Sequence, residues 1–192
     1  MRRLYDWMMR HAASPAAPYV LAIVSFLESS MFPIPPDVML VPMVLADRRK
    51  AFRYALIATV ASVVGGLVGY AIGYYLFPVL GEPILNFYGY GGKFEQVQTW
   101  FAENGVWIVI VKGMTPIPYK LISIAAGVAK MDVYSFVAAS VIARAMRFFL
   151  VAGLLYFFGE PIRDFIEKRL ALVTTAFVVI LVGGFVAVKY LI

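Results

Sequence analysis

The sequence predicts an all-α integral membrane protein. We expect an inverted repeat of two re-entrant helical hairpins, each followed by a transmembrane helix, plus an N-terminal interfacial helix and a C-terminal transmembrane helix. This prediction rests on the apolar composition, on proline-rich interruptions of apolar stretches, and on the distribution of basic residues. Of 192 residues, 62% are hydrophobic and 15% are charged, and the mean hydropathy is +0.84. Soluble domains are roughly half apolar and about a quarter charged, so most apolar side chains here should face lipid.

Composition also narrows the function. The net charge of +6 lies in short clusters between apolar runs, which is typical of topology signals in membrane proteins and not of a nucleic-acid-binding surface. The chain has no cysteine, and its one histidine, His11, does not build a zinc cluster alone. It has no Ser/His/Asp set and no phosphate-binding glycine loop. We therefore expect no enzyme activity, no metal, no cofactor and no nucleic-acid partner.

Apolar periodicity divides the chain into segments of one membrane domain, residues 1–192. The first 14 residues place Leu4, Trp7, Met8 and His11 at helical spacing beside basic residues, which predicts a helix in the headgroup region. The expected elements after it are the first repeat 15–84 with hairpin 16–46 and span 54–80, an interfacial connector 85–105, the second repeat 106–162 with hairpin 106–129 and span 133–158, and a last span 170–191.

An internal repeat supports this division. Pro33-Ile34-Pro35 is matched by Pro116-Ile117-Pro118, and Gly81-Glu82-Pro83-Ile84 is matched in the same order by Gly159-Glu160-Pro161-Ile162. Each half is therefore predicted to be a broken apolar segment followed by one spanning helix.

Prolines break both apolar segments. Proline lacks an N–H, fixes its φ and pushes the preceding residue out of the helical region. Backbone unwound at membrane depth is tolerated only where protein buries it or where it lines a wet cavity. Each broken segment is therefore either a complete crossing or a hairpin that returns to its own side. The predicted breaks are Pro33, Pro35, Pro36, Pro116 and Pro118.

Positive charge favours the hairpins, because Lys and Arg in short loops stay on the cytoplasmic side. Two complete crossings would place the basic N-terminus and the Arg48 to Arg53 cluster on opposite faces. With two hairpins, the repeats become inverted and the N-terminus is cytoplasmic. One side then collects Arg2, Arg3, Arg10, Arg48, Arg49, Lys50, Arg53, Arg163, Lys168 and Arg169.

Two carboxylates lie beside the first break. Glu28 precedes it within an apolar stretch, and Asp37 follows it directly. Placing an ionised carboxylate in hydrocarbon costs on the order of several kcal/mol. Such a group is therefore expected to be protonated, paired with a cation or in contact with water. We predict a transport or proton-coupling role for both. For Asp37, a helix N-cap after Pro36 is the structural alternative.

Basic residues in the second half supply the opposite sign. With the repeats superposed, Lys120 falls on Asp37 and Lys112 lies next to the position of Glu28, so these lysines are candidate charge partners; Lys120 snorkelling to the interface is the alternative. Arg144 and Arg147 share one face of the 133–158 span. They are predicted to contact a phosphate or lipid headgroup or to pair with Glu28 and Asp37, and snorkelling is the third interpretation.

Glycines repeat along one side of the first span, at Gly65, Gly66, Gly69 and Gly73. Close helix packing accounts for them fully.

The run Glu28-Ser29-Ser30-Met31-Phe32-Pro33-Ile34-Pro35-Pro36-Asp37, together with Lys112-Gly113-Met114-Thr115-Pro116-Ile117-Pro118-Tyr119-Lys120, resembles the DedA family. This family is related to the SNARE-associated Golgi and VTT-domain proteins, and the chain looks most similar to its YqaA-like branch. The resemblance implies inverted re-entrant hairpins, a prokaryotic plasma (inner) membrane location, and movement of lipids with anionic or phosphate-bearing headgroups between leaflets. It also implies that Glu28 and Asp37 act in proton-dependent function.

The leading hypothesis is a lipid flippase or scramblase. One alternative is a small-solute or cation/proton antiporter that uses the same carboxylates, and another is a structural membrane protein that recruits partners through residues 82–105. The sequence leaves homo-oligomerisation and the identity of the lipid open.

Overall fold

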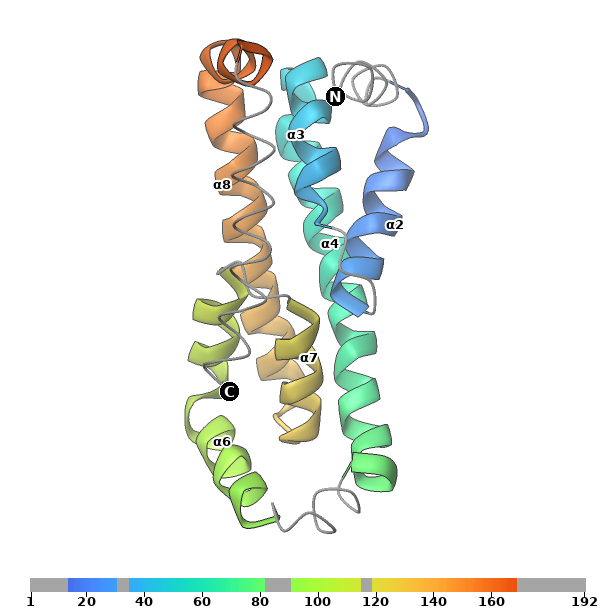
Figure 1. Cartoon of the computed structure of the whole chain (residues 1–192), viewed down its shortest axis with the longest axis vertical. Coiled ribbons are helices and arrows are strands. Elements are labelled where there is room, and N and C mark those ends of the chain that lie inside the picture. The colour runs from blue at the N-terminus through green and yellow to red at the C-terminus, as the bar shows by residue number, and fades with distance from the viewer. Residues whose placement is uncertain (1–13, 31–34, 82–90, 115–118, 169–192) are drawn as a thin grey trace.

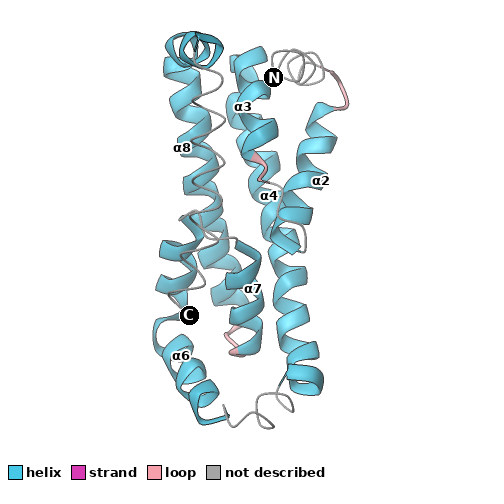
Figure 2. Ribbon diagram, viewed as in Figure 1, coloured by secondary structure: helices cyan, strands magenta, loops and turns pink. Residues whose placement is uncertain are grey.

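A computed structural model describes residues 14–30, 35–81, 91–114 and 119–168. All regular structure in these ranges is helical (Figure 2). The elements are α2 (Ala17–Ser30), α3 (Asp37–Ala46), the short η1 (Arg48–Lys50), α4 (Ala51–Ala71), η2 (Ile72–Gly81), α6 (Gly91–Met114), α7 (Tyr119–Val128) and α8 (Val133–Lys168). The predicted all-α fold is confirmed for this part of the chain.

The helices form an elongated bundle (Figure 1). α4 with η2 and α8 run along most of its length, and the four shorter helices occupy its two ends. α2 runs from one end to mid-length, and α3 runs back to that end. α6 rises from the opposite end to mid-length, and α7 returns to it. Two helix pairs therefore approach the middle of the bundle from opposite ends.

Glycines of α4 and η2 set the close approach of the short helices. A Cβ at Gly65 would meet the backbone carbonyl of Phe26 in α2, and one at Gly73 would meet the backbone of Ile124 in α7. Gly127 of α7 lies just as close to the backbone of Tyr70. The predicted packing role of Gly65, Gly66, Gly69 and Gly73 is confirmed, because a Cβ at any of these positions would collide with α2 or α7.

Two apolar clusters fill the bundle. One joins α2, α3, α4 and α8 around Leu21, Leu40, Met43, Tyr54 and Phe148. The other joins α4, α6, α7 and α8 and includes Tyr70, Val109, Tyr119, Ile122 and Phe136.

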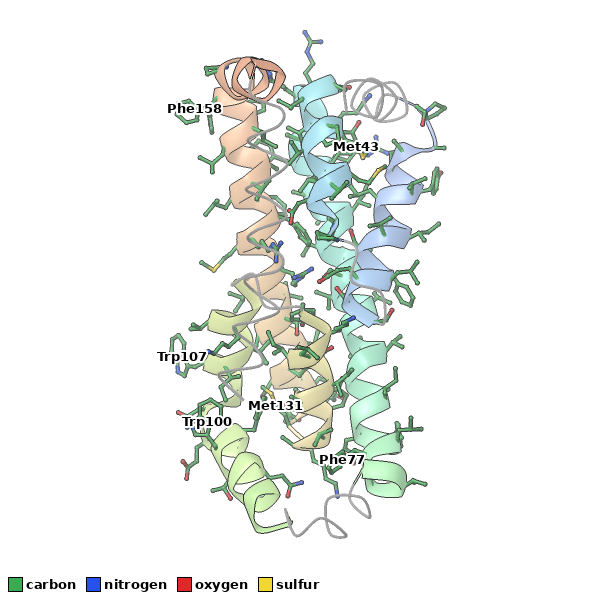
Figure 3. All side chains as sticks on the ribbon, in the orientation of Figure 1. Met43, Phe77, Trp100, Trp107, Met131 and Phe158 are labelled. Atoms are coloured by element: carbon green, nitrogen blue, oxygen red, sulfur yellow. The ribbon has the colours of Figure 1, made fainter. Side chains whose placement is uncertain are left out.

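Many large apolar side chains point outward instead of into these clusters. Trp107 is 68% exposed and Phe158 is 56% exposed, and both project from the side of the bundle (Figure 3). Within the described residues, two helices are long and apolar enough to cross a membrane, Arg48–Val79 and Val133–Gly159.

Several boundaries differ from the sequence prediction. α6 is one continuous helix that runs across the expected junction between the connector 85–105 and the hairpin 106–129, and that division stays a prediction. Gly105 does not break α6, because Gly105 packs against the Met131 side chain. The span 54–80 becomes a π-helix from Ile72 onward with Pro78 inside it. Proline lacks the N–H that an α-helical hydrogen bond needs, and Pro78 is the residue of this segment that is least compatible with a regular α-helix.

α8 continues to Lys168 and is kinked at Phe158, which has φ −114 and ψ 18. The predicted end of the span at residue 158 therefore matches a break in the helix. The interfacial helix, apart from residue 14, and the last span 170–191 lie outside the described residues.

Candidate functional site

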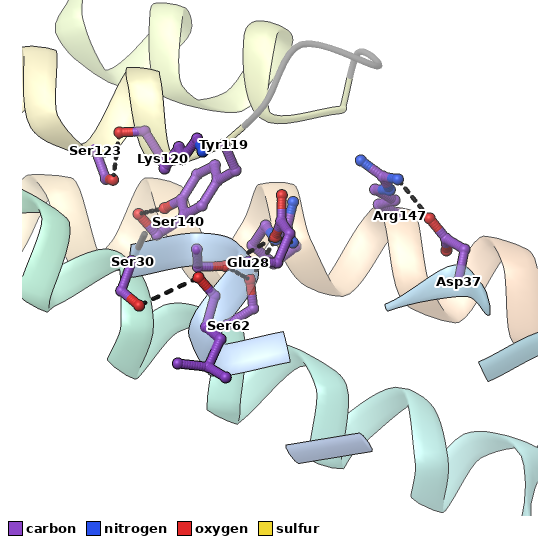
Figure 4. A network of polar contacts seen from close by, with 12 residues as sticks. Glu28, Ser30, Asp37, Ser62, Tyr119, Lys120, Ser123, Ser140 and Arg147 are labelled. Carbon is purple, nitrogen blue, oxygen red and sulfur yellow. Dashed lines mark hydrogen bonds and ion pairs between the residues drawn. The ribbon is translucent and has the colours of Figure 1, made fainter. Parts of the chain in front are cut away.

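Arg144 lies at the centre of a polar site midway along the bundle. Its side chain is 0% exposed, although it belongs to a long apolar helix, α8. The guanidinium Nη2 donates to Oε2 of Glu28 at 2.8 Å. Glu28 lies near the end of α2 (Figure 4), where that helix reaches mid-length of the bundle (Figure 1). A buried charge is stable only when it is paired and hydrogen-bonded, and this pair supplies the opposite charge.

Serine hydroxyls complete the hydrogen bonding around this pair. Arg144 Nε donates to Oγ of Ser62 in α4 at 2.5 Å. Ser62 Oγ lies 2.6 Å from Ser29 Oγ, and Ser29 donates to the Glu28 carboxylate at 3.1 Å. One guanidinium thereby links α2, α4 and α8 through a continuous network.

Aromatic rings enclose the guanidinium on its other sides. Arg144 Cζ lies 4.6 Å from the ring centroid of Tyr119 and 4.8 Å from that of Phe148. These distances are within the range of cation–π attraction. The Tyr119 hydroxyl donates to Ser140 Oγ, which fixes the ring. Tyr119 is the first residue of α7, so the second short helix pair also reaches this site.

A second ion pair lies on the same face of α8. Arg147 Nη2 donates to Oδ2 of Asp37 at 2.5 Å, and the two side chains are 23% and 20% exposed (Figure 4). Pro36 occupies the N-cap position of α3, with no side-chain cap. The N-cap interpretation of Asp37 is therefore wrong: its carboxylate pairs across to α8.

Two polar atoms of these pairs have no hydrogen-bond partner among the described residues. They are Nη1 of Arg144 and Oδ1 of Asp37, and both are buried. An unsatisfied buried polar group costs about 1–3 kcal/mol. Among the described residues, the site therefore retains one donor atom and one acceptor atom without a hydrogen-bond partner.

The remaining predicted site residues take different positions. Lys112 is exposed on α6, and Lys120 is half-buried on α7 beside Tyr119; their charge-compensating role stays a prediction. Pro35 and Pro36 immediately precede α3, and Pro36 is fully buried. Pro33, Pro116 and Pro118 lie outside the described residues.

Sequence reasoning missed Ser62, Tyr119, Phe148 and Ser140 as members of the site. A serine or an aromatic residue in an apolar helix carries no signal until its neighbours are known. Within the described ranges, no group of His, Cys, Asp and Glu side chains could hold a metal ion.

Comparison with known proteins decides the family. The VTT domain family matches residues 34–157, which include α3, α4, α7 and the two arginines of α8. The chain belongs to this family, the DedA family. The resemblance found at the proline-rich motifs is thereby confirmed, whereas the YqaA-like branch stays a prediction.

Three bacterial proteins are similar in sequence to this chain. An uncharacterized protein of Haemophilus influenzae is 37% identical over 97% of this chain and 96% of its own length. A Histophilus somni homologue is 37% identical over 97% of both chains. Undecaprenyl phosphate transporter A of Staphylococcus aureus is 27% identical over 65% of this chain and 66% of its own length. No solved structure matches the chain.

Proposed function

We propose that this DedA-family protein is a membrane lipid transporter, a flippase or scramblase that moves a phospholipid or a polyprenyl-phosphate lipid between leaflets. Family membership and the relative named undecaprenyl phosphate transporter A support a lipid-related membrane transporter. The observation that carries the proposal is the position of the two Arg–carboxylate pairs. They lie at mid-length of an apolar bundle, where the helix pairs from opposite ends meet.

The lengths of the short helices support a re-entrant arrangement in the bilayer. α2 has 14 residues and α3 has 10, which at about 1.5 Å per residue gives about 21 Å and about 15 Å. The hydrocarbon core is about 30 Å thick, so neither helix crosses it alone. In our proposal, α2/α3 enters from one leaflet and α6/α7 from the other, and the ion pairs lie near the midplane.

Guanidinium groups at this depth suit a lipid phosphate. Arg forms bidentate hydrogen bonds to phosphate oxygens. Nη1 of Arg144, beside the pair with Glu28, has no hydrogen-bond partner within the described ranges. In this structure, Glu28 pairs with Arg144 and Asp37 pairs with Arg147. A phosphate would therefore have to displace a carboxylate to form a full set of hydrogen bonds with either arginine. We infer that the hairpin ends separate during transport and that the phosphate then replaces a carboxylate as the arginine's partner.

In our proposal, this replacement of a carboxylate by a phosphate is coupled to protons. Protonation of Glu28 or Asp37 would remove the attraction to Arg144 or Arg147 and would free the cation for phosphate. Arg144 of α8 pairs with the Glu28 carboxylate, and Tyr119 of α7 packs on the same guanidinium.

Liposome reconstitution tests the proposal. The protein is incorporated with fluorescent phospholipid or labelled polyprenyl phosphate, and leaflet exchange is measured by quenching of the outer leaflet. We expect exchange above the protein-free rate, and a loss of at least about tenfold for Arg147→Gln, because a hydrogen bond from a charged group contributes about 1.5–3 kcal/mol. Asp47→Asn removes an exposed pair with Lys50 and is the matched control. Exchange at the protein-free rate for every lipid would overturn the proposal.

A proton-coupled antiporter for a small solute is the second candidate, because the same ion-paired carboxylates would serve it. It predicts solute uptake driven by a pH gradient and abolished by Glu28→Gln, with no lipid movement. A structural role that acts through residues 82–105 predicts instead that Glu28→Gln has no effect on either assay.

We place the protein in the prokaryotic plasma (inner) membrane with the N-terminus in the cytoplasm. Bacterial relatives and two apolar helices of spanning length support the location. Arg48, Arg49 and Lys50 lie together between α3 and α4, and the positive-inside rule assigns that end to the cytoplasm.

A further inference from the structure

An open pocket lies at the end of the bundle where α4 continues into η2 and where α7 connects to α8. Its volume is about 480 Å³, and Tyr70, Tyr74, Tyr75, Lys130 and Asp132 line it. Pockets of about 300–1,000 Å³ accommodate small ligands. It is separate from the mid-length ion pairs, and neither the proposed transport chemistry nor the comparisons assign it a role.

Aromatic rings form one wall of the pocket. Tyr74 and Tyr75 have ring centroids 5.0 Å apart at 75°, so their faces meet at a corner. Tyr70 stacks on Phe136 at 5.0 Å and also stacks on Tyr74. The rings of Tyr74 and Tyr75 come from the π-helical turn, a distortion often found at functional sites. Exposed tyrosine faces of this kind attract ammonium groups.

The connection between α7 and α8 supplies two opposite charges. Lys130 has φ 54, and Lys130 N–H and Met131 N–H donate to the carbonyls of Gly127 and Ala126. This is a Schellman motif, whose left-handed position usually holds glycine. A lysine at such a position accepts backbone strain and places a cation on the rim of the pocket.

Asp132 is held in place by the first turn of α8, the helix that follows the connection. Its Oδ2 accepts the backbone N–H of Ser135 at 2.8 Å, which caps α8. The Tyr70 hydroxyl donates to the carbonyl of Met131 between the two charged residues. The connection is thereby fixed against the aromatic wall, and both charged residues line the same pocket.

We propose that this pocket binds a zwitterion in which an ammonium group is joined by a short linker to a phosphate or carboxylate. The faces of Tyr74 and Tyr75 together with Asp132 hold the ammonium group, and Lys130 holds the anionic group. A simple anion would be repelled by Asp132 and a simple cation by Lys130, whereas a zwitterion satisfies both. A phospholipid headgroup and a free soluble zwitterion share this chemistry.

Calorimetric titration of the detergent-solubilised full chain tests the site. The probes are glycerophosphocholine, which is soluble, dihexanoylphosphatidylcholine, which is a zwitterionic lipid, and dihexanoylphosphatidylglycerol, which is an anionic lipid. We expect tighter binding of the phosphatidylcholine than of the phosphatidylglycerol. Tyr75→Ala and Asp132→Asn should each weaken it by about fivefold or more. Tight binding of glycerophosphocholine would identify a soluble ligand, and tight binding of the lipid alone would identify a headgroup.

Two of the substitutions are compatible with the local backbone, so a change in affinity reports on the pocket and not on loss of the fold. Asparagine caps helices as well as aspartate does, and Lys130→Asn retains a residue that tolerates the left-handed backbone. Tyr134→Ala is the matched control, because Tyr134 is 82% exposed and does not line the pocket.

Equal affinity for the two lipids, or variants that bind like Tyr134→Ala, would overturn the proposal and leave the tyrosines as interfacial anchors only. Binding is measured without leaflet exchange, so this result does not depend on whether the protein transports lipid.

Discussion

Arg144 is the side chain whose environment the protein controls most tightly. It is fully buried, and Glu28, Ser62 and two aromatic rings surround it. Moving a guanidinium from water into the protein interior costs on the order of several kcal/mol. The buried Arg144 therefore depends on the opposite charge of Glu28. Breaking a buried pair from one side therefore costs more than the pair itself contributes.

Glu28→Gln should consequently destabilise the protein by about 3–5 kcal/mol, because the Arg144 charge stays buried without its counterion. The measurement is thermal unfolding in detergent by circular dichroism. Asp47→Asn breaks the exposed Asp47–Lys50 pair and should leave the melting temperature almost unchanged. Equal melting temperatures for the two variants would contradict the assigned burial.

Asp132 provides a prediction for acidic pH. The hydrogen bond from the Ser135 backbone N–H lowers the pKa of Asp132 below its ordinary value of 3.8. Because the pKa is lower in the folded chain than in the unfolded chain, the ionised cap stabilises the fold fully above pH 3.8 and loses this contribution as the pH falls through the folded-state pKa. Asp132→Asn keeps an uncharged cap, so its melting temperature should fall less than that of the wild type on acidification below pH 3.8. Parallel decreases for both proteins would refute the cap's contribution.

The charged members of the site could be predicted from sequence, but their pairing could not. Glu28 and Arg144 are conspicuous because a charge inside an apolar stretch is expensive. The choice between Arg144 and the lysines as partner of Glu28 depends on how α2 and α8 pack, which residue order does not encode locally. Ser62 and Tyr119 became recognisable only after four helices were placed around one guanidinium.

At the scale of elements, glycine contacts determine how closely α2 approaches α4. Gly65→Ala should destabilise the fold by about 1–3 kcal/mol, because its Cβ would collide with the rigid carbonyl of Phe26. Gly153→Ala in α8 is the matched control: a Cβ there meets nothing within 4 Å, and alanine favours a helix by up to about 1 kcal/mol. The two melting temperatures should move in opposite directions. A rise for both would show that α2 can shift without cost.

Helix existence was predictable from periodicity, whereas helix continuity was not. The broken stretch before residue 46 resolves into α2 and α3 as expected from its prolines. α6 instead runs through Asn104 and Gly105 without a break, because packing on Met131 compensates the weak helix propensity of glycine. The π-helical turn at Ile72 has only Pro78 as a local signal.

At the scale of the whole molecule, the two ends of the bundle are related by the opposite directions of their short helix pairs. α2 and α3 begin and end near one extremity, and together their 14 and 10 residues would be long enough for one crossing if they were collinear. The membrane topology therefore distinguishes a hairpin from a broken crossing without any transport assay.

Single-cysteine labelling makes this distinction, because the chain has no native cysteine. Ala16 precedes α2, Arg49 lies between α3 and α4, and Lys130 lies in the α7–α8 connection. If α2/α3 is re-entrant, Ala16→Cys and Arg49→Cys should react with an impermeant maleimide from the cytoplasmic side only, and Lys130→Cys only from outside. A broken crossing would place Ala16 and Arg49 on opposite sides of the membrane, because the chain between them would then traverse the whole hydrocarbon core. That result would also remove the midplane position of Glu28 and Arg144 on which the transport proposal depends.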